Sequence, residues 1–234
     1  MWYNVAMIYV CSDIHGQYNL FVKLLKAVKF GKDDVMYVGG DVVDKGPDGI
    51  RLLQLVKNTP NIHVIMGNHE YQFVKYYWAL MSKSPSNFDE VLAKLQGYFD
   101  GDGHLLDWQT VDYLEGLPFF VETTNFVLVH SGVPVDANNN VIAPQYALPE
   151  QLLYDRQFKD PSVLPNTPKC ILYGHTPTSY LCNKPKILRY QRPNTTGDSI
   201  GDYYKIHLDV GAWYEGTMAC LCIDTMQEFY VTND

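Results

Sequence analysis

Five short apolar segments of this 234-residue chain are each followed at once by a glycine-containing cluster of histidine, aspartate or asparagine. The clusters are Ser12-Asp13-Ile14-His15-Gly16, Gly40-Asp41-Val42-Val43-Asp44-Lys45-Gly46, Gly67-Asn68-His69-Glu70, His130-Ser131-Gly132 and Gly174-His175-Thr176-Pro177. In an open α/β sheet, ligand-binding residues gather at the carboxyl ends of the strands. Glycines beside them allow sharp turns and a close approach of the backbone. The pattern therefore predicts strands whose ends meet around one polar site.

The residue types in these clusters indicate a metal site. Four of the seven histidines lie in them, namely His15, His69, His130 and His175. Imidazole and oxygen donors without thiolates suit manganese, iron or zinc, and one carboxylate can bridge two ions. Each cluster alone is compatible with an ordinary turn, and a single histidine is compatible with a packing role. Their joint placement after five expected strands favours a shared metal centre.

Hydrophobic periodicity divides the chain into two parts. Strands and amphipathic helices alternate at first, with strands expected over 5–11, 35–38 and 62–66 and helices over 19–29, 50–56 and 71–81. The middle, 82–117, is expected to be mostly helical around a loop at 101–103. Later strands are expected at 119–122, 126–129, 171–173, 187–190, 205–210, 217–223 and 229–232, the first two as a hairpin. This order predicts an α/β fold of two stacked sheets flanked by helices.

Length, charge and cysteine content limit the class of protein. A chain of this length is expected to form a single domain, 1–234. The net charge of −8 argues against a nucleic-acid-binding protein, which needs a basic face. The sequence shows no signal-peptide pattern and no apolar run of membrane-spanning length, and its five cysteines fit no disulfide framework. We therefore expect a cytoplasmic protein that binds neither nucleic acid nor membrane.

The series SDIHG, GDVVDKG, GNHE, HSG and GHTP resembles the phosphoprotein phosphatases of the calcineurin-like metallophosphoesterase superfamily. Within it, the small bacterial and phage serine/threonine protein phosphatases are the most similar. The resemblance runs from residue 12 to residue 177, and Asp209-Val210-Gly211-Ala212 resembles the closing hairpin of that family. It implies a four-layer αββα sandwich of two mixed sheets flanked by helices. It also implies two divalent metal ions, with Mn²⁺ expected first and Fe or Zn as alternatives.

The resemblance assigns a ligand set to the two ions. Asp13 and His15 would hold the first ion, Asp41 would bridge both, and the second would be held by Asn68, His130 and His175. A hydroxide bridging the ions would then attack phosphorus directly, without a covalent phosphoenzyme. A cysteine-phosphatase mechanism is excluded, because no cysteine of this chain begins a Cys-x5-Arg loop.

Catalytic and substrate-binding roles follow from the same resemblance. His69 would be the general acid, oriented by Asp44. Lys45, Arg156 and Asn68 would bind the substrate phosphate. Lys45 departs from the family pattern, which usually has arginine there. Lysine keeps the charge but lacks the planar fork that grips two phosphate oxygens, so we expect a looser phosphate clamp.

The function expected first is a metal-dependent phosphomonoesterase that acts on a phosphorylated protein or a small phosphoester, as a serine/threonine protein phosphatase does. A symmetrical dinucleoside tetraphosphatase is an alternative with the same fold. The resemblance implies that those enzymes read Gly-Asn-His-Asp and lack a carboxylate at position 44, so Asp44 and Glu70 favour the protein phosphatase. Gly46-Pro47-Asp48, in contrast, resembles the dinucleotide enzymes. A non-catalytic homologue that only binds phosphate is a further alternative.

The other three histidines are expected to be structural or solvent-exposed rather than catalytic. His63 and His207 lie in strand patterns and are expected to be structural. His104 lies in a glycine-rich loop, where solvent exposure is expected before a role at the rim of the site.

Overall fold

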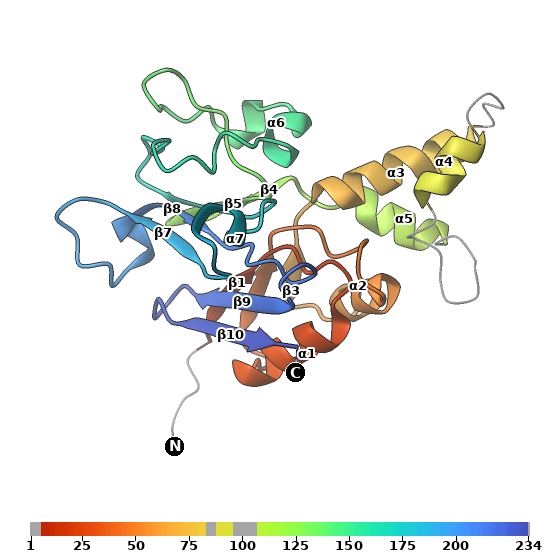
Figure 1. Cartoon of the computed structure of the whole chain (residues 1–234), viewed down its shortest axis with the longest axis horizontal. Coiled ribbons are helices and arrows are strands. Elements are labelled where there is room, and N and C mark those ends of the chain that lie inside the picture. Colours follow the sequence, from red (N-terminus) through yellow and green to blue (C-terminus); the bar gives the residue numbers. More distant parts are fainter. Residues whose placement is uncertain (1–5, 83–87, 96–106, 234) are drawn as a thin grey trace.

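Two five-stranded sheets form the centre of the protein in the computed structural model, which describes residues 6–82, 88–95 and 107–233 (Figure 1). The first sheet contains β1 (Ile8–Cys11), β2 (Val35–Val38), β3 (Ile62–Val64), β9 (Thr217–Cys222) and β10 (Glu228–Thr232). The second contains β4 (Phe120–Glu122), β5 (Phe126–Val129), β6 (Cys170–Tyr173), β7 (Leu188–Gln191) and β8 (Tyr203–His207). The strand orders are β10-β9-β1-β2-β3 and β4-β5-β6-β8-β7.

Both sheets are mixed, which confirms the predicted fold class. In the first sheet β1, β2 and β3 are parallel, β9 is antiparallel to β1, and β10 at the edge is antiparallel to β9. In the second sheet β5, β6 and β8 are parallel, and β4 and β7 run antiparallel at the edges. The predicted β4–β5 hairpin is present, with Phe120 paired to Val129. Because the parallel strands point the same way, their carboxyl ends come together.

Helices flank the sheets and extend from them. Their bounds are α1 (Tyr18–Ala27), α2 (Gly49–Lys57), α3 (Asn68–Met81), α4 (Phe88–Leu95), α5 (Trp108–Glu115), α6 (Pro149–Leu153) and α7 (Ser179–Cys182), with 3₁₀ turns η3 (Pro144–Tyr146) and η4 (Ile200–Asp202). In Figure 1, α1 and α2 lie against the first sheet, whereas α3, α4 and α5 form an arm that projects to one side. The first turn of α3, which begins at Asn68, lies at the base of this arm, next to the segment that follows β3.

The alternating side chains of β1 show why the layers stack. Val10 points into the core between the sheets, with Leu128 and Leu172, whereas Tyr9 and Cys11 point to the core beneath the helices. Successive strand residues face opposite sides, so a strand with both faces apolar is buried on both. On the outer face of the second sheet, an apolar core includes residues of α6 and of the irregular segments beside it. On this face the second sheet is therefore covered by the short helix α6 and irregular chain rather than by long helices.

Several boundaries differ from those expected. Helix α3 begins at Asn68 rather than at residue 71, because its polar first turn carries no apolar periodicity. The expected strand at 205–210 is shifted to Tyr203–His207, and the short helices α6 and α7 were not anticipated. The expected loop at 101–103 and His104 lie outside the described residues. His63 and His207 do lie in strands, as predicted.

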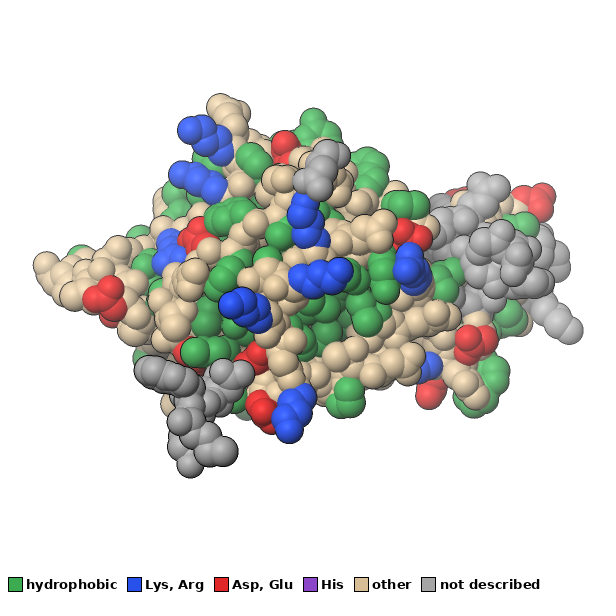
Figure 2. Space-filling model, turned by 90° about the horizontal axis from the view of Figure 1, so that it is seen from below, with side chains coloured by type: hydrophobic (Ala, Val, Ile, Leu, Met, Phe, Trp, Pro, Cys, Tyr) green, Lys and Arg blue, Asp and Glu red, His purple; other side chains and the backbone are tan. Residues whose placement is uncertain are grey.

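Figure 2 shows the face of the molecule that is seen from below the view of Figure 1. Its Lys and Arg side chains are separated by apolar and uncharged ones. No histidine is visible among the described residues of that face. None of the helices in the described segments is long and apolar enough to cross a membrane. All five cysteines are free. The histidine, aspartate and asparagine side chains of the five clusters lie instead at the carboxyl ends of the parallel strands.

Candidate metal centre

Asp41, directly after β2, lies at the centre of the predicted site. Its Oδ2 is 3.5 Å from Nε2 of His15, 3.5 Å from Nε2 of His130 and 3.8 Å from Nε2 of His69. Its side chain is buried, and it belongs to both groups of described side chains that could hold a metal ion: His15 with Asp41 and His69, and Asp41 with His130 and His175. A carboxylate between two such groups is placed as a bridging ligand would be.

Three acceptor atoms converge beside Asp41. Asn68 Oδ1 is 2.8 Å from His130 Nε2 and 2.9 Å from His175 Nδ1, and these two nitrogens are 3.1 Å apart. His130 Nδ1 is 2.8 Å from the Gly39 carbonyl, to which it must donate its hydrogen. In a neutral ring, Nε2 then presents a lone pair to the oxygen of Asn68. Lone pairs that face one another at this distance fit a cation between them, since ligands with bonds of ~2.1 Å lie about 3.0–3.4 Å apart.

His15, like His130, has a backbone carbonyl next to its Nδ1. Its Nδ1 lies 3.3 Å from the Val43 carbonyl, and its Nε2 lies 3.5 Å from Asp41 Oδ2 and 3.0 Å from Lys45 Nζ. Burial lowers the pKa of His15 well below its ordinary value, and the positive charge of Lys45 lowers it further. Burial also lowers the pKa of His175, to about 2, with help from His130. Both imidazoles are therefore neutral near pH 7, as metal ligands must be.

Asp13 is less directly placed than the other predicted ligands. Its carboxylate accepts hydrogen bonds from the Ser12 hydroxyl and from the backbone N–H of His175, at 3.1 and 3.0 Å for its two oxygens. These bonds tie the end of β1 to the end of β6. Asp13 belongs to neither three-residue group, and His69 occupies the corresponding place in the group of His15 and Asp41.

Four carboxylates are buried at the site, those of Asp13, Asp41, Glu70 and Asp209. Burial raises the pKa of Asp41 well above its ordinary value, and the charges of Glu70 and Asp13 add to this effect while His69 opposes it. Burial and the charge of Asp13 likewise raise the pKa of Asp209. Buried like charges are stable in ionised form only when cations compensate them. The donor set thus fits divalent metal ions.

The backbone is strained at the same positions. Asp13, His15, Asp41 and His175 have φ angles of 53°, 47°, 54° and 74°. This left-handed region costs a residue with a side chain roughly 1–2 kcal/mol. Such strain concentrates at functional sites, where the surrounding structure holds it in place. Four of the six predicted ligands are held in this way.

Glu70 has a role that the sequence did not reveal. Its Oε2 accepts the N–H groups of Asp41 (2.8 Å) and Gly67 (3.0 Å), and its Oε1 accepts those of Val42 (2.8 Å) and Val43 (3.0 Å). The side chain is fully buried. One carboxylate therefore holds the loop after β2 against the start of α3. Because it binds backbone rather than facing the cleft, Glu70 says little about the choice of substrate.

His69 and Asp44 form a tight pair, with 2.6 Å between Nδ1 and Oδ2. The hydrogen bond to His69 lowers the pKa of Asp44 to about 2. Burial by itself lowers the pKa of His69, but Asp41 and the bond with Asp44 outweigh it and raise the pKa. The pair keeps a proton on Nδ1 and leaves Nε2 directed toward Asp41, 3.8 Å away. This geometry suits an imidazole that gives a proton to a leaving group.

A cleft of about 300 Å³ is lined by side chains of different chemical kinds. His15, His175, Lys45 and Arg156 are among them. Lys45 Nζ is 3.0 Å from His15 Nε2. The Asp155 N–H donates to the Ser131 hydroxyl at 2.9 Å, which fixes the turn that carries Arg156. The structure thus brings both cations that were predicted to bind phosphate to the cleft that His15 and His175 line.

Aromatic side chains line the same cleft, namely Tyr180, Trp213 and Tyr214. Sequence reasoning missed these residues and Asp209. Asp209 follows β8, so the rule that placed the other ligands at strand ends could have found it. A larger hollow of about 600 Å³, lined in part by Tyr37, His63 and Tyr113, contains none of the predicted site residues.

Comparison with known proteins gives the site a context. The family model of the calcineurin-like phosphoesterases matches residues 6–208. A symmetrical bis(5'-nucleosyl)-tetraphosphatase of Wigglesworthia glossinidia brevipalpis is 38% identical over 71 residues, which is 30% of this chain and 26% of that protein. The enzyme of the same name from Colwellia psychrerythraea is 29% identical over 185 residues, which is 74% of this chain and 61% of that protein. The chain thus matches less than two thirds of the length of either relative.

The fold has a close counterpart among solved structures. The crystal structure of a candidate diadenosine tetraphosphatase superposes with a TM-score of 0.69. The superposition covers 100% of this chain and 96% of that one, with 18% sequence identity. At this identity the likeness establishes the fold and leaves the substrate to be argued from the site.

Proposed function

Because the chain belongs to the calcineurin-like phosphoesterase family, we propose that it is a two-metal phosphohydrolase that cleaves dinucleoside tetraphosphates symmetrically. The observation that carries the hydrolytic part is the convergence of Asn68 Oδ1, His130 Nε2 and His175 Nδ1 beside Asp41. The choice of substrate class is supported by the curated relatives, which are tetraphosphatases. It replaces the protein phosphatase as the function expected first.

The two ions would be held by the residues that the sequence predicted. Asp13, His15 and Asp41 would hold one, and Asp41, Asn68, His130 and His175 would hold the other. When bound, divalent cations polarise phosphoryl oxygens and lower the pKa of water to near neutrality. The donor set of oxygens and imidazoles is compatible with Mn²⁺, Fe or Zn.

Lys45 and Arg156, which line the cleft, would act on the phosphate chain together with His69. Lys45 and Arg156 neutralise non-bridging oxygens, and they hold the phosphorus in position relative to the metal-ligating residues. A tetraphosphate carries more negative charge than a phosphomonoester, which suits a cleft with two cations beside the metal ligands. His69 would donate a proton from Nε2 to the departing oxygen. Symmetrical cleavage of the chain gives two nucleoside diphosphates.

Serine/threonine phosphatase activity remains a second candidate, favoured by the pairing of His69 with Asp44 at 2.6 Å. An alkoxide is a poor leaving group unless it is protonated as it departs, whereas a departing phosphate, with a pKa of about 6, is stable without a proton. An oriented general acid is therefore of most value for an alkyl phosphoester. The pair does not oppose anhydride cleavage, but it makes the ester a reasonable second substrate.

Side-by-side kinetics test the proposal. With Mn²⁺ present, kcat/KM is measured for diadenosine tetraphosphate and for a phosphoserine peptide. We expect the dinucleotide to be preferred by at least about tenfold, and Asp41→Asn to abolish both activities. A preference for the peptide would overturn the proposed substrate class. Activity that is unaffected by Asp41→Asn would overturn the proposed site.

A further inference from the structure

We propose that Tyr180, Trp213 and Tyr214 form a nucleobase subsite that determines which phosphorylated substrates enter the cleft. These residues are hereafter the aromatic wall. The inference rests on the proposed function and extends it from the phosphate chain to the nucleoside.

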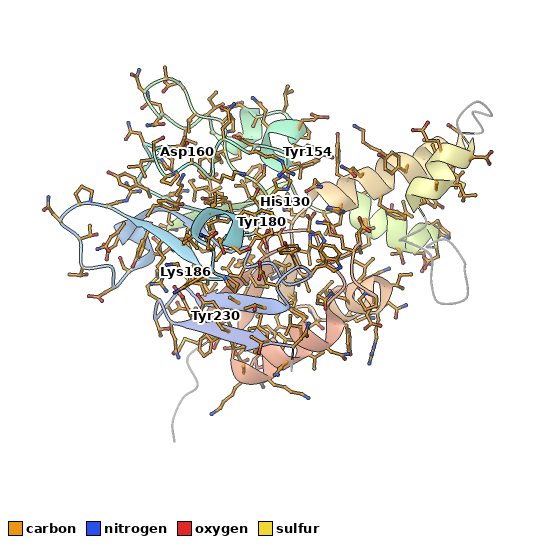
Figure 3. The ribbon with its side chains drawn as sticks, viewed as in Figure 1. His130, Tyr154, Asp160, Tyr180, Lys186 and Tyr230 are labelled. Atoms are coloured by element: carbon orange, nitrogen blue, oxygen red, sulfur yellow. The ribbon has the colours of Figure 1, made fainter. Side chains whose placement is uncertain are left out.

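The three large aromatic side chains of the wall are exposed to solvent. Trp213 is 48% exposed, Tyr214 59% and Tyr180 60%. All three line the cleft that also contains His175, and Figure 3 shows Tyr180 on α7 in the same part of the molecule as His130. Exposed aromatic residues gathered at one place mark a binding surface more often than single exposed residues do. The aromatic wall is therefore available to a ligand that reaches the metal-ligating residues.

The segments that carry the aromatic wall are tied to one another. The Thr178 N–H, just before α7, donates to the Asp209 carbonyl at 2.8 Å. The Gly211 N–H donates to Asp209 Oδ1 at 2.9 Å, and the Glu215 N–H donates to the Gly211 carbonyl at 2.7 Å. Tyr180 and Tyr214 contact one another edge to face, with ring centroids 5.5 Å apart. A wall held in this way loses little conformational freedom when a ligand stacks on it.

The polarity of the cleft matches that of a nucleotide. Lys45 and Arg156 supply positive charge for a phosphate chain, and the aromatic wall supplies flat apolar surface in the same cleft. A volume of about 300 Å³ suits one base and its sugar better than an extended peptide. Stacking depends on ring faces rather than on a hydrogen-bond pattern, so it tolerates different bases. We therefore expect adenine and guanine dinucleotides to be accepted alike.

The test separates the base from the phosphate. Isothermal titration calorimetry of the Mn²⁺-loaded protein is carried out with ADP, which carries a base, and with inorganic tripolyphosphate, which does not. Trp213→Ala should weaken ADP binding by roughly tenfold, the order expected for the loss of one stacking contact. The affinity for tripolyphosphate should change by less than about twofold, and Trp213→Phe should restore most of the affinity for ADP.

Trp108→Ala is the matched control, because Trp108 is 67% exposed but does not line the cleft. Equal weakening of ADP and tripolyphosphate binding by Trp213→Ala, or no weakening of either, would overturn the subsite. So would a loss of phosphoserine-peptide hydrolysis in Trp213→Ala with unchanged ADP affinity, because the wall would then serve a peptide. These measurements of ADP affinity do not require turnover. An inactive protein that still binds ADP through Trp213 would therefore contradict the proposed function and keep the subsite.

Discussion

At the scale of single residues, the site depends on backbone positions that admit no side chain. A Cβ at Gly174 would overlap the Asp13 carboxylate and the Ser12 hydroxyl. The Gly174 N–H also donates to the His130 carbonyl at 2.7 Å, which joins two ligand-bearing strand ends. The glycine of the fifth cluster is thus required by close packing between β1 and β6.

We expect substitution of Gly174 to lower the affinity for metal more than it lowers the stability of the fold. Gly174→Ala would displace Asp13, so we expect Mn²⁺ affinity to fall by about 10–100-fold, the effect of moving a group that orients metal ligands. Calorimetric titration of the metal-free protein with Mn²⁺ measures the change. Gly201→Ala is the control, since a Cβ there meets only the Ser199 hydroxyl at 3.8 Å. Equal Mn²⁺ affinities in the two variants would show that Asp13 is not a ligand.

The role assigned to His69 depends on the leaving group. His69→Gln should lower kcat/KM for an alkyl phosphate such as β-glycerophosphate by about 10²-fold or more, the usual contribution of a general acid. For diadenosine tetraphosphate we expect a loss below about tenfold, because a departing phosphate with a pKa of about 6 is stable without a proton. Kinetics with both substrates give the comparison. Equal losses would indicate that His69 acts on binding rather than as the acid.

At the scale of elements, Glu70 connects the loop after β2 to the first turn of α3. Glu70→Gln keeps the size of the side chain but replaces one acceptor oxygen by a donor that faces backbone N–H groups. We expect the free energy of unfolding to fall by about 1.5–3 kcal/mol, the worth of hydrogen bonds to a charged group. Urea denaturation measures it, with Glu150→Gln, an exposed residue in the first turn of α6, as the control. A loss no larger than that of the control would contradict the linking role.

The sequence predicted the strand ends well because each ligand cluster is local and directly follows an apolar run. It predicted less where function depends on contacts between distant segments. Glu70 accepts hydrogen bonds from the backbone N–H groups of residues 41–43, and no pattern of residue types predicts such bonds. The aromatic wall joins Tyr180 to Trp213 and Tyr214, which are more than thirty positions away in the chain. The start of α3 was placed too late because a polar first turn has no periodicity.

At the scale of the whole molecule, buried histidines couple stability to pH. Burial lowers the pKa of His207 to about 3 from an ordinary value of 6.5. Between these values the unfolded chain binds a proton that the folded chain does not, so stability is complete above pH 6.5 and is lost as pH falls toward 3. The ring stacks on Tyr173, with centroids 4.4 Å apart, and a phenyl ring can keep this contact.

We therefore expect the unfolding free energy of His207→Phe to fall less steeply than that of the parent as the pH is lowered from 6.5 to 3. The difference in unfolding free energy between variant and parent should change by up to about 1.4 kcal/mol per pH unit between pH 6.5 and 3. Denaturant titrations across this range, with a chelator present to remove any contribution of metal release, provide the measurement. Parallel profiles for the two proteins would mean that His207 is protonated alike in the folded and unfolded chains.

The product mixture from diadenosine tetraphosphate tests the proposed function most directly. The protein is incubated with this substrate and Mn²⁺, and the nucleotides are separated by ion-exchange chromatography. We predict ADP as the sole nucleotide product, with no turnover in the presence of a chelator or in Asp41→Asn. Formation of AMP and ATP would contradict symmetrical cleavage. An unchanged dinucleotide, alongside metal-dependent release of phosphate from a phosphoserine peptide, would identify a protein phosphatase instead.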